Sequence, residues 1–173
     1  MKISTFILVL VFLLKVSSVG AQEYLKIGHV NIQELVQQLP ETDSIQEVLK
    51  KEADDMEKMF EEMIAEHETN VKKFEAEKSS YSEFVRNSKE TDLMEMASKI
   101  QQYQQNANQQ LQKRNMELIQ PVYENINKAI EKVALKNNFT YILDLSNGAV
   151  AFHSPSSKNL DSQVLTELGI NVR

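Results

Sequence analysis

The sequence contains no cysteine and no tryptophan, and it has only four glycines and three prolines among 173 residues. Without cysteine, disulfide bonds cannot hold the fold together. Aromatic residues make up 7% of the chain, which leaves little material for one large globular core. The four glycines are isolated from one another, so the sequence has no glycine-rich phosphate-binding loop.

Residues with catalytic or metal-binding chemistry are also scarce. The three histidines, His29, His67 and His153, have no second histidine or cysteine at ligand spacing, so we expect no metal site. Asp144 follows apolar residues of a predicted strand, but the sequence offers it no acid–base partner. We therefore expect a protein that is not an enzyme and that binds no cofactor.

Residues 1–21 have the features of a secretory signal peptide. A basic start at Lys2 precedes an apolar run over residues 3–14, and small residues lead to a predicted cleavage site near Ala21. The run is short for a membrane span, although an uncleaved anchor is the alternative. Cleavage would remove two lysines and no acid, which changes the formal net charge from −6 to −8. Such an acidic protein is unsuited to general nucleic-acid binding.

Residues 42–137 contain no glycine, and Pro121 is their only proline. Large apolar residues recur in steps of three and four, first from Ile45 to Val85 and again from Leu93 to Val133, with an average close to the helical period. This pattern predicts two helices of equal length in an antiparallel hairpin, with the turn at residues 87–92. Each helix should reach about 65 Å, at about 1.5 Å per residue.

Two features of this predicted arm concern its packing and its direction. Residues 101–112 are mostly glutamine and asparagine, so we expect the half of the arm near the tip to pack loosely. Pro121 removes a backbone donor and crowds the carbonyl of Glu117, which predicts a bend. With the turn at residues 87–92, Met59 should lie at the same level as Pro121.

The two ends of the chain, residues 22–41 and 138–173, are expected to form a small β-rich body. Residues 24–30 read as a strand, followed by a short helix over residues 32–39 that Asn31 and Glu34 cap. Ser44 with Glu47 repeats the capping spacing at the start of the arm. Asp161 is expected to cap the last helix, which Gly169 ends.

Asn147-Gly148 is the strongest β-hairpin signal, because both central residues of a type I′ turn need positive φ. The predicted hairpin places Leu145 opposite Val150, Leu143 opposite Phe152 and Tyr141 opposite Ser154.

The body is too small to be comfortably stable alone, since it holds only about 50 to 60 residues. Its strands carry apolar groups on both faces. We therefore predict an α+β protein in which a long antiparallel helical hairpin stands on a body that completes its sheet with further copies of the chain. The residues expected to build this oligomerisation body are Ile27, Val30, Tyr141, Leu143, Val150 and Phe152.

Six methionines lie on the arm. Met56, Met63 and Met116 fall on the apolar stripe or close to it and are expected to pack the helices together. Met59, Met94 and Met96 lie beside it, where a flexible thioether suits an adaptable binding surface.

The order of these features around a long helical hairpin resembles the Skp/OmpH family of periplasmic chaperones. The resemblance covers the whole chain, and its motifs are Lys26-Ile27-Gly28-His29-Val30-Asn31, Gln120-Pro121-Val122-Tyr123, residues 126–133, residues 139–144, residues 147–152 and Asn159-Leu160-Asp161. It implies a homotrimer whose arms hold unfolded outer-membrane proteins without ATP. On this reading the client-binding residues are Met59, Met94, Met96, Tyr81, Phe84 and Tyr103.

The charge differs from that of the family, whose well-studied members are strongly basic. Residues 41–68 contain eleven acids and three lysines. This run is either a solvated helix face or a field that selects which clients approach. It leaves only a weak contact with the outer membrane or lipopolysaccharide, through lysines and an arginine nearer the tip. The alternative function is a structural coiled coil of the cell envelope that binds a folded partner.

Overall fold

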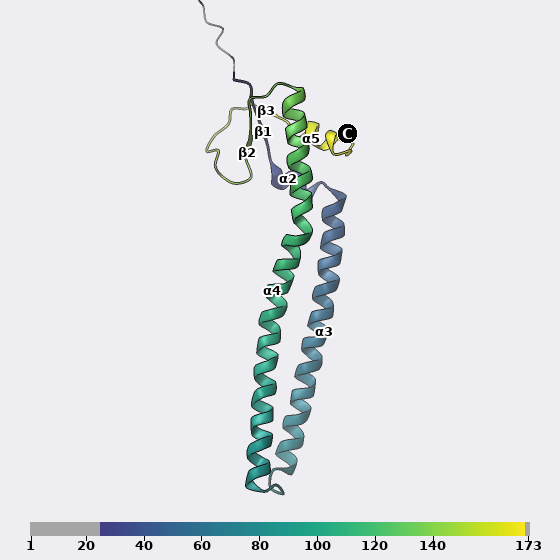
Figure 1. Ribbon diagram of the computed structural model, residues 1–173, viewed down its shortest axis with the longest axis vertical. Coiled ribbons are helices and arrows are strands. Elements are labelled where there is room, and N and C mark those ends of the chain that lie inside the picture. Colours follow the sequence, from purple (N-terminus) through teal and green to yellow (C-terminus); the bar gives the residue numbers. More distant parts are fainter. Residues whose placement is uncertain (1–24, 172–173) are drawn as a thin grey trace, which may run out of the picture.

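A computed structural model describes residues 25–171, and the predicted signal peptide lies outside the described residues. Two long helices, α3 (Pro40–Glu77) and α4 (Glu83–Lys136), run antiparallel and form an arm that hangs from a small body (Figure 1). The body contains the strands β1 (Ile27–Val30), β2 (Tyr141–Asp144) and β3 (Lys158–Asn159), with the short helices α2 (Ile32–Gln37) and α5 (Asp161–Glu167). The predicted α+β architecture of a helical hairpin on a small sheet is confirmed.

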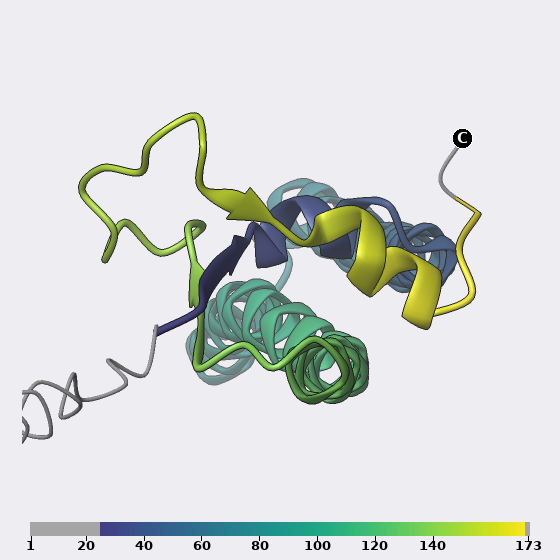
Figure 2. The same cartoon turned by 90° about the horizontal axis from the view of Figure 1, so that it is seen from above.

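The sheet has the order β2-β1-β3, and β1 pairs in parallel with both neighbours. In the pairing of β1 with β2, Ile27 lies opposite Tyr141 and Val30 opposite Asp144. The N-terminal strand β1 is the central strand of the sheet. The central strand thus joins the two ends of the chain, and the whole arm is inserted between β1 and β2 (Figure 2).

The core lies where the last turns of α4 pack against the body. Side chains from β1, α2, the last turns of α4 and α5 meet there, and the most deeply buried are Val30, Leu35, Ile126, Leu160, Val164 and Leu165. Gly28 is needed at the contact between β1 and this cluster, because an added Cβ would lie 2.7 Å from Leu160 Cδ1 and 3.0 Å from Phe139 Cε1. Apolar burial at this junction fixes the arm to the body.

The arm helices are unequal, so the prediction of equal lengths is wrong. Helix α3 has 38 residues and α4 has 54. At about 1.5 Å per residue these correspond to about 57 Å and about 81 Å. The difference arises because the last turns of α4 leave the arm and pack in the body, where Val122, Ile126, Ala129 and Val133 are buried.

The tip turn lies at residues 78–82, not at the predicted 87–92. The side chain of Ser82 accepts a hydrogen bond from Val85 N and thereby caps α4. The prediction missed this cap because the apolar stripe continues through the turn. The pairing of the helices shifts accordingly, and Arg114 contacts Glu52 at 3.1 Å. Val122 lies beside Leu39 and Glu41, so the prediction that Met59 shares the level of Pro121 is also wrong.

The predicted hairpin at Asn147-Gly148 does not form. Gly148 has φ of +71°, but Asn147 does not have the positive φ that a type I′ turn requires. Its side chain instead accepts a hydrogen bond from Ala149 N at 2.9 Å. Residues 145–157 form a loop, and β2 pairs with β1 because the long crossover through the arm returns the chain parallel to its start.

The helix caps agree with the sequence in part. Asn31 caps α2: its side-chain oxygen accepts a hydrogen bond from Glu34 N, and its side-chain NH2 donates to the Glu34 carboxylate. Gly169 ends the last helix with φ of +84°. Ser44 is not a cap, because α3 already begins at Pro40, a residue suited to a first helical position. Asp161 is not the cap of the last helix either, because it is the first residue of α5 and the cap position is Leu160. Its carboxylate instead accepts a hydrogen bond from Asn31 N.

Candidate functional site

The arm carries an apolar stripe that it does not bury. Among the described arm residues, α3 buries only Thr42 at its base and Phe74 at its tip, and α4 buries nothing before Val122. The facing residues between these ends, such as Leu49, Val71 and Leu111, stay half-buried. Two helices alone cover only one side of each stripe, so the arm offers apolar surface along most of its length.

Several of the predicted binding residues lie on this surface. Phe84 is 83% exposed, Met94 is 70% exposed and Met59 is 48% exposed. The remaining three, Tyr81, Met96 and Tyr103, are half-buried between the helices. The exposed and half-buried groups are spread over both helices and the tip turn, so the structure gathers them on one arm but not in one pocket.

Two of the half-buried residues also hold the helices together. The Tyr103 hydroxyl donates to the backbone oxygen of Met56 at 3.2 Å, and Asn70 donates to the Met96 sulfur at 3.7 Å. Met116 is 63% exposed, so the prediction that it packs between the helices is wrong.

The sequence predicts the glutamine-rich segment in the half of the arm near the tip, but the structure places it elsewhere. Because the turn lies at residues 78–82, residues 101–112 lie along the middle of α4, where Tyr103 reaches Met56. The prediction of a loosely packed half near the tip therefore placed this segment in the wrong part of the arm.

The tip itself contains the one buried aromatic residue of the described arm. Phe74 is 8% exposed, and its ring stacks on Tyr81 with centroids 6.3 Å apart. Lys89 Nζ lies 5.5 Å from the Tyr81 ring centroid. A hydrogen bond to the Glu77 carboxylate raises the pKa of the Tyr81 hydroxyl, with smaller contributions from burial and the Glu77 charge.

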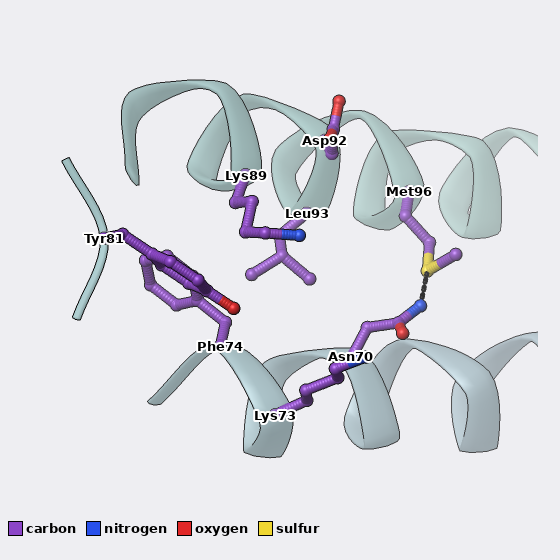
Figure 3. A pocket seen from close by; sticks show the side chains of 8 residues that line it. All are labelled: Asn70, Lys73, Phe74, Tyr81, Lys89, Asp92, Leu93 and Met96. Carbon is purple, nitrogen blue, oxygen red and sulfur yellow. Dashed lines mark hydrogen bonds between the residues drawn. The ribbon is translucent and has the colours of Figure 1, made fainter. Parts of the chain in front are cut away.

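Beside Phe74 the two helices leave a pocket of about 230 Å³. Figure 3 shows its lining from both helices and the turn: Asn70, Lys73, Phe74, Tyr81, Lys89, Asp92, Leu93 and Met96. Sequence reasoning missed this pocket, because it placed Tyr81 and Val85 on a continuous helix. Ser82, which caps the start of α4, is the sequence feature from which the turn and the pocket could have been predicted.

The body presents a second apolar surface. Phe152 is 81% exposed, Tyr141 is 57% exposed, and Ile27 and Leu143 are exposed as well. Val150 is half-buried, whereas Val30 belongs to the core of the chain itself. Leu25 and Leu135 are further exposed residues that the sequence did not single out.

Pro121 lies inside α4 at the point where the helix passes from the arm to the body. It is exposed, while the next residue, Val122, is buried in the core. The residue therefore occupies a junction, where a change of helix direction would move the whole arm.

Within residues 25–171, no three acidic, histidine or cysteine side chains come together as metal ligands. No helix of this described part is long and apolar enough to cross a membrane.

Known proteins resemble the chain over most of its length. Chaperone protein Skp of Photorhabdus laumondii is 30% identical over 155 residues, covering 87% of this chain and 90% of that protein. Chaperone protein Skp of Yersinia enterocolitica is 27% identical, covering 83% and 85%. A crystal structure from Caulobacter crescentus, described as an OmpH-like outer membrane chaperone, superposes with a TM-score of 0.70 at 15% identity over 82% of each chain.

The fold is therefore shared with a solved protein, and the sequence similarity extends through both the arm and the body. The family described as "Outer membrane protein (OmpH-like)" matches residues 26–168, and the chain belongs to this family.

Proposed function

We propose that the protein is an ATP-independent holdase chaperone that binds unfolded outer-membrane proteins in the periplasm and prevents their aggregation in transit. The observation that carries the proposal is the long arm with an apolar stripe that its own two helices leave half-buried. The Skp name of the relatives and the outer-membrane description of the family support the same class of client.

The holding surface consists of Met59, Phe84 and Met94, with Tyr81, Met96 and Tyr103 between the helices. Each contact is shallow, so a client is held by many weak contacts at once. These contacts can break one at a time, so the client can leave without nucleotide hydrolysis. The flexible methionines adapt to side chains of different shape.

The body forms a homotrimer in this proposal, and three arms enclose the client. Exposed Tyr141, Leu143 and Phe152 support a shared interface, since apolar groups of this size are normally covered. Within the described residues, β2 pairs only with β1, so its other edge is open to a strand from a second copy. In this proposal the body comprises residues 22–41 and 138–173 and the arm residues 42–137, with the last turns of α4 packed into the body.

Residues 1–21 direct export and are removed near Ala21 in this proposal, which places the mature protein in the periplasm. A weak contact with the outer membrane or its lipopolysaccharide would use the basic residues near the tip, because the base of α3 is acidic.

The direct test dilutes a denatured outer-membrane β-barrel protein into buffer with and without the mature chain and follows light scattering. The expected result is suppression of scattering at about one trimer per client. Unchanged scattering at several-fold excess would reject the holdase. Multi-angle light scattering of the mature chain tests the trimer, and a stable folded monomer would contradict it.

One observation favours a second candidate, a scaffolding coiled coil that binds a folded partner. Phe74 is buried at the tip and its ring stacks on Tyr81, and a well-packed arm tip is what this candidate predicts. This candidate predicts a single saturable partner and little loss of binding when exposed methionines of the arm are changed to serine.

A further inference from the structure

The pocket at the tip of the arm has the size of a single side chain. Its volume is about 230 Å³. Sites for whole small molecules usually have volumes of about 300–1,000 Å³. An occupant that fills it is therefore one large side chain with the backbone groups next to it.

The floor of the pocket is apolar. Phe74 is buried, and Leu93 and Met96 are half-buried on the facing helix. The Tyr81 ring closes the end nearest the turn and stacks on Phe74 (Figure 3). Asn70 is held by its hydrogen bond to the Met96 sulfur, so the inner wall is fixed before anything binds.

The mouth of the pocket is positively charged. Lys73 lines it from α3 and Lys89 from α4, and neither is in an ion pair within residues 25–171. The Lys89 side chain extends across the pocket, while the Asp92 carboxylate points away from Phe74 (Figure 3). Lys73 and Lys89 thus bring two ammonium groups to the lining of a pocket whose floor is apolar, and Lys89 Nζ lies 5.5 Å from the Tyr81 ring centroid.

This combination matches the last residue of a polypeptide. A chain terminus is the place where a protein carries an apolar side chain and a carboxylate on the same residue. We propose that the pocket binds the carboxyl-terminal residue of an unfolded client, with a large apolar side chain against Phe74 and Leu93 and the α-carboxylate between Lys73 and Lys89. The inference rests on the proposed chaperone function. It adds one specific binding site, for the client's carboxyl terminus, to the non-specific contacts along the arm.

The alternative occupant with the same charge is an anionic lipid. Acyl chains need a longer apolar channel than a pocket of about 230 Å³ offers. The geometry therefore favours the peptide terminus, and a lipid surface is kept as an outcome of the test.

The test uses the full mature chain and four fluorescein-labelled decapeptides of one common polar sequence. Two end in phenylalanine and two in serine, and each pair consists of a free acid and an amide. Fluorescence anisotropy should show that the phenylalanine acid binds about fivefold more tightly than its amide, the effect of two solvent-exposed ion pairs. Both serine peptides should bind more weakly than the phenylalanine acid.

The double variant Lys73→Gln/Lys89→Gln should bind the phenylalanine acid and its amide equally. Both lysines are exposed or at the surface of the tip, so the fold should persist, which circular dichroism checks. The matched control is Lys50→Gln/Lys58→Gln, which removes the same charge from exposed positions of α3 nearer the body. This control should keep the preference for the free acid.

Equal binding of acid and amide by the wild-type chain would overturn the inference. So would a preference that survives Lys73→Gln/Lys89→Gln. Wild-type binding to phosphatidylglycerol vesicles that the double variant loses, without a peptide preference, would assign the pocket to a membrane surface instead.

The aggregation assay keeps the two proposals separable. If the chain suppresses client aggregation but ignores the peptide terminus, only the pocket inference fails. If it binds the terminus but does not suppress aggregation, the holdase proposal fails while the site remains.

Discussion

Met59 and Met94 expose their thioethers on different helices, where they contribute little to the packing of the arm. The variant Met59→Ser/Met94→Ser should therefore bind an unfolded outer-membrane protein about threefold to tenfold more weakly, because each change removes part of an apolar contact. Fluorescence titration with a labelled client measures this loss. The exposed polar control Gln105→Ser should bind as wild type, and an unchanged affinity of the methionine variant would remove these residues from the client surface.

Gly28 is a structural residue of the body. The substitution Gly28→Ala should reduce the free energy of unfolding by about 1–3 kcal/mol, because the new methyl group would crowd Leu160 and Phe139. Urea denaturation followed by circular dichroism measures this effect.

The matched control for that change is Gly148→Ala, where nothing lies within 4 Å of an added Cβ. Its cost comes only from the positive φ and should be nearer 1 kcal/mol. A larger loss at position 148 than at position 28 would contradict the packing described around β1.

At the scale of single elements, Pro121 is the one residue whose backbone interrupts the hydrogen bonds of α4. The substitution Pro121→Ala should restore the bond to the Glu117 carbonyl and raise the free energy of unfolding by about 1–3 kcal/mol. It should also remove the predicted bend, which small-angle X-ray scattering would detect as a changed radius of gyration.

The neighbouring exposed residue provides the control, because Gln120→Ala alters helix propensity without adding a backbone donor. It should leave both the stability and the scattering curve close to wild type. If Pro121→Ala changes neither property, Pro121 does not set the direction of the arm.

The two long helices were recognisable from the chain because their apolar period extends over many turns. Their junction was not, since Tyr81 and Val85 continue the stripe through the actual turn. The stripe pattern counts only apolar positions, while the helix begins at Ser82, whose side chain supplies a cap. The pairing of the short strands was harder to predict. The Asn147-Gly148 pair favours a hairpin from its local sequence, and that local sequence does not specify which strand will be the neighbour.

For the whole molecule, the small core and the exposed apolar face of the body connect stability with assembly. If the body is completed by further copies, the melting temperature should rise with protein concentration, because dilution favours the separated chains. Differential scanning calorimetry over a hundredfold range of concentration measures this dependence.

The substitution Phe152→Ser provides the matched variant, because Phe152 is 81% exposed and contributes little to the core of a single chain. It should lower the melting temperature most at low concentration. A melting temperature that is independent of concentration in both proteins would contradict the shared body.

The sequence by itself determined the helical hairpin, its attachment to a small mixed body, and the helix ends at Asn31 and Gly169, because periodicity and capping are local properties of the chain. The tertiary structure decided the parallel sheet, the position of the tip turn and the pocket beside Phe74. These features depend on contacts between segments far apart in the chain, such as β1 with β2 and Phe74 with the facing helix, and local patterns do not encode which of several compatible partners buries the most surface.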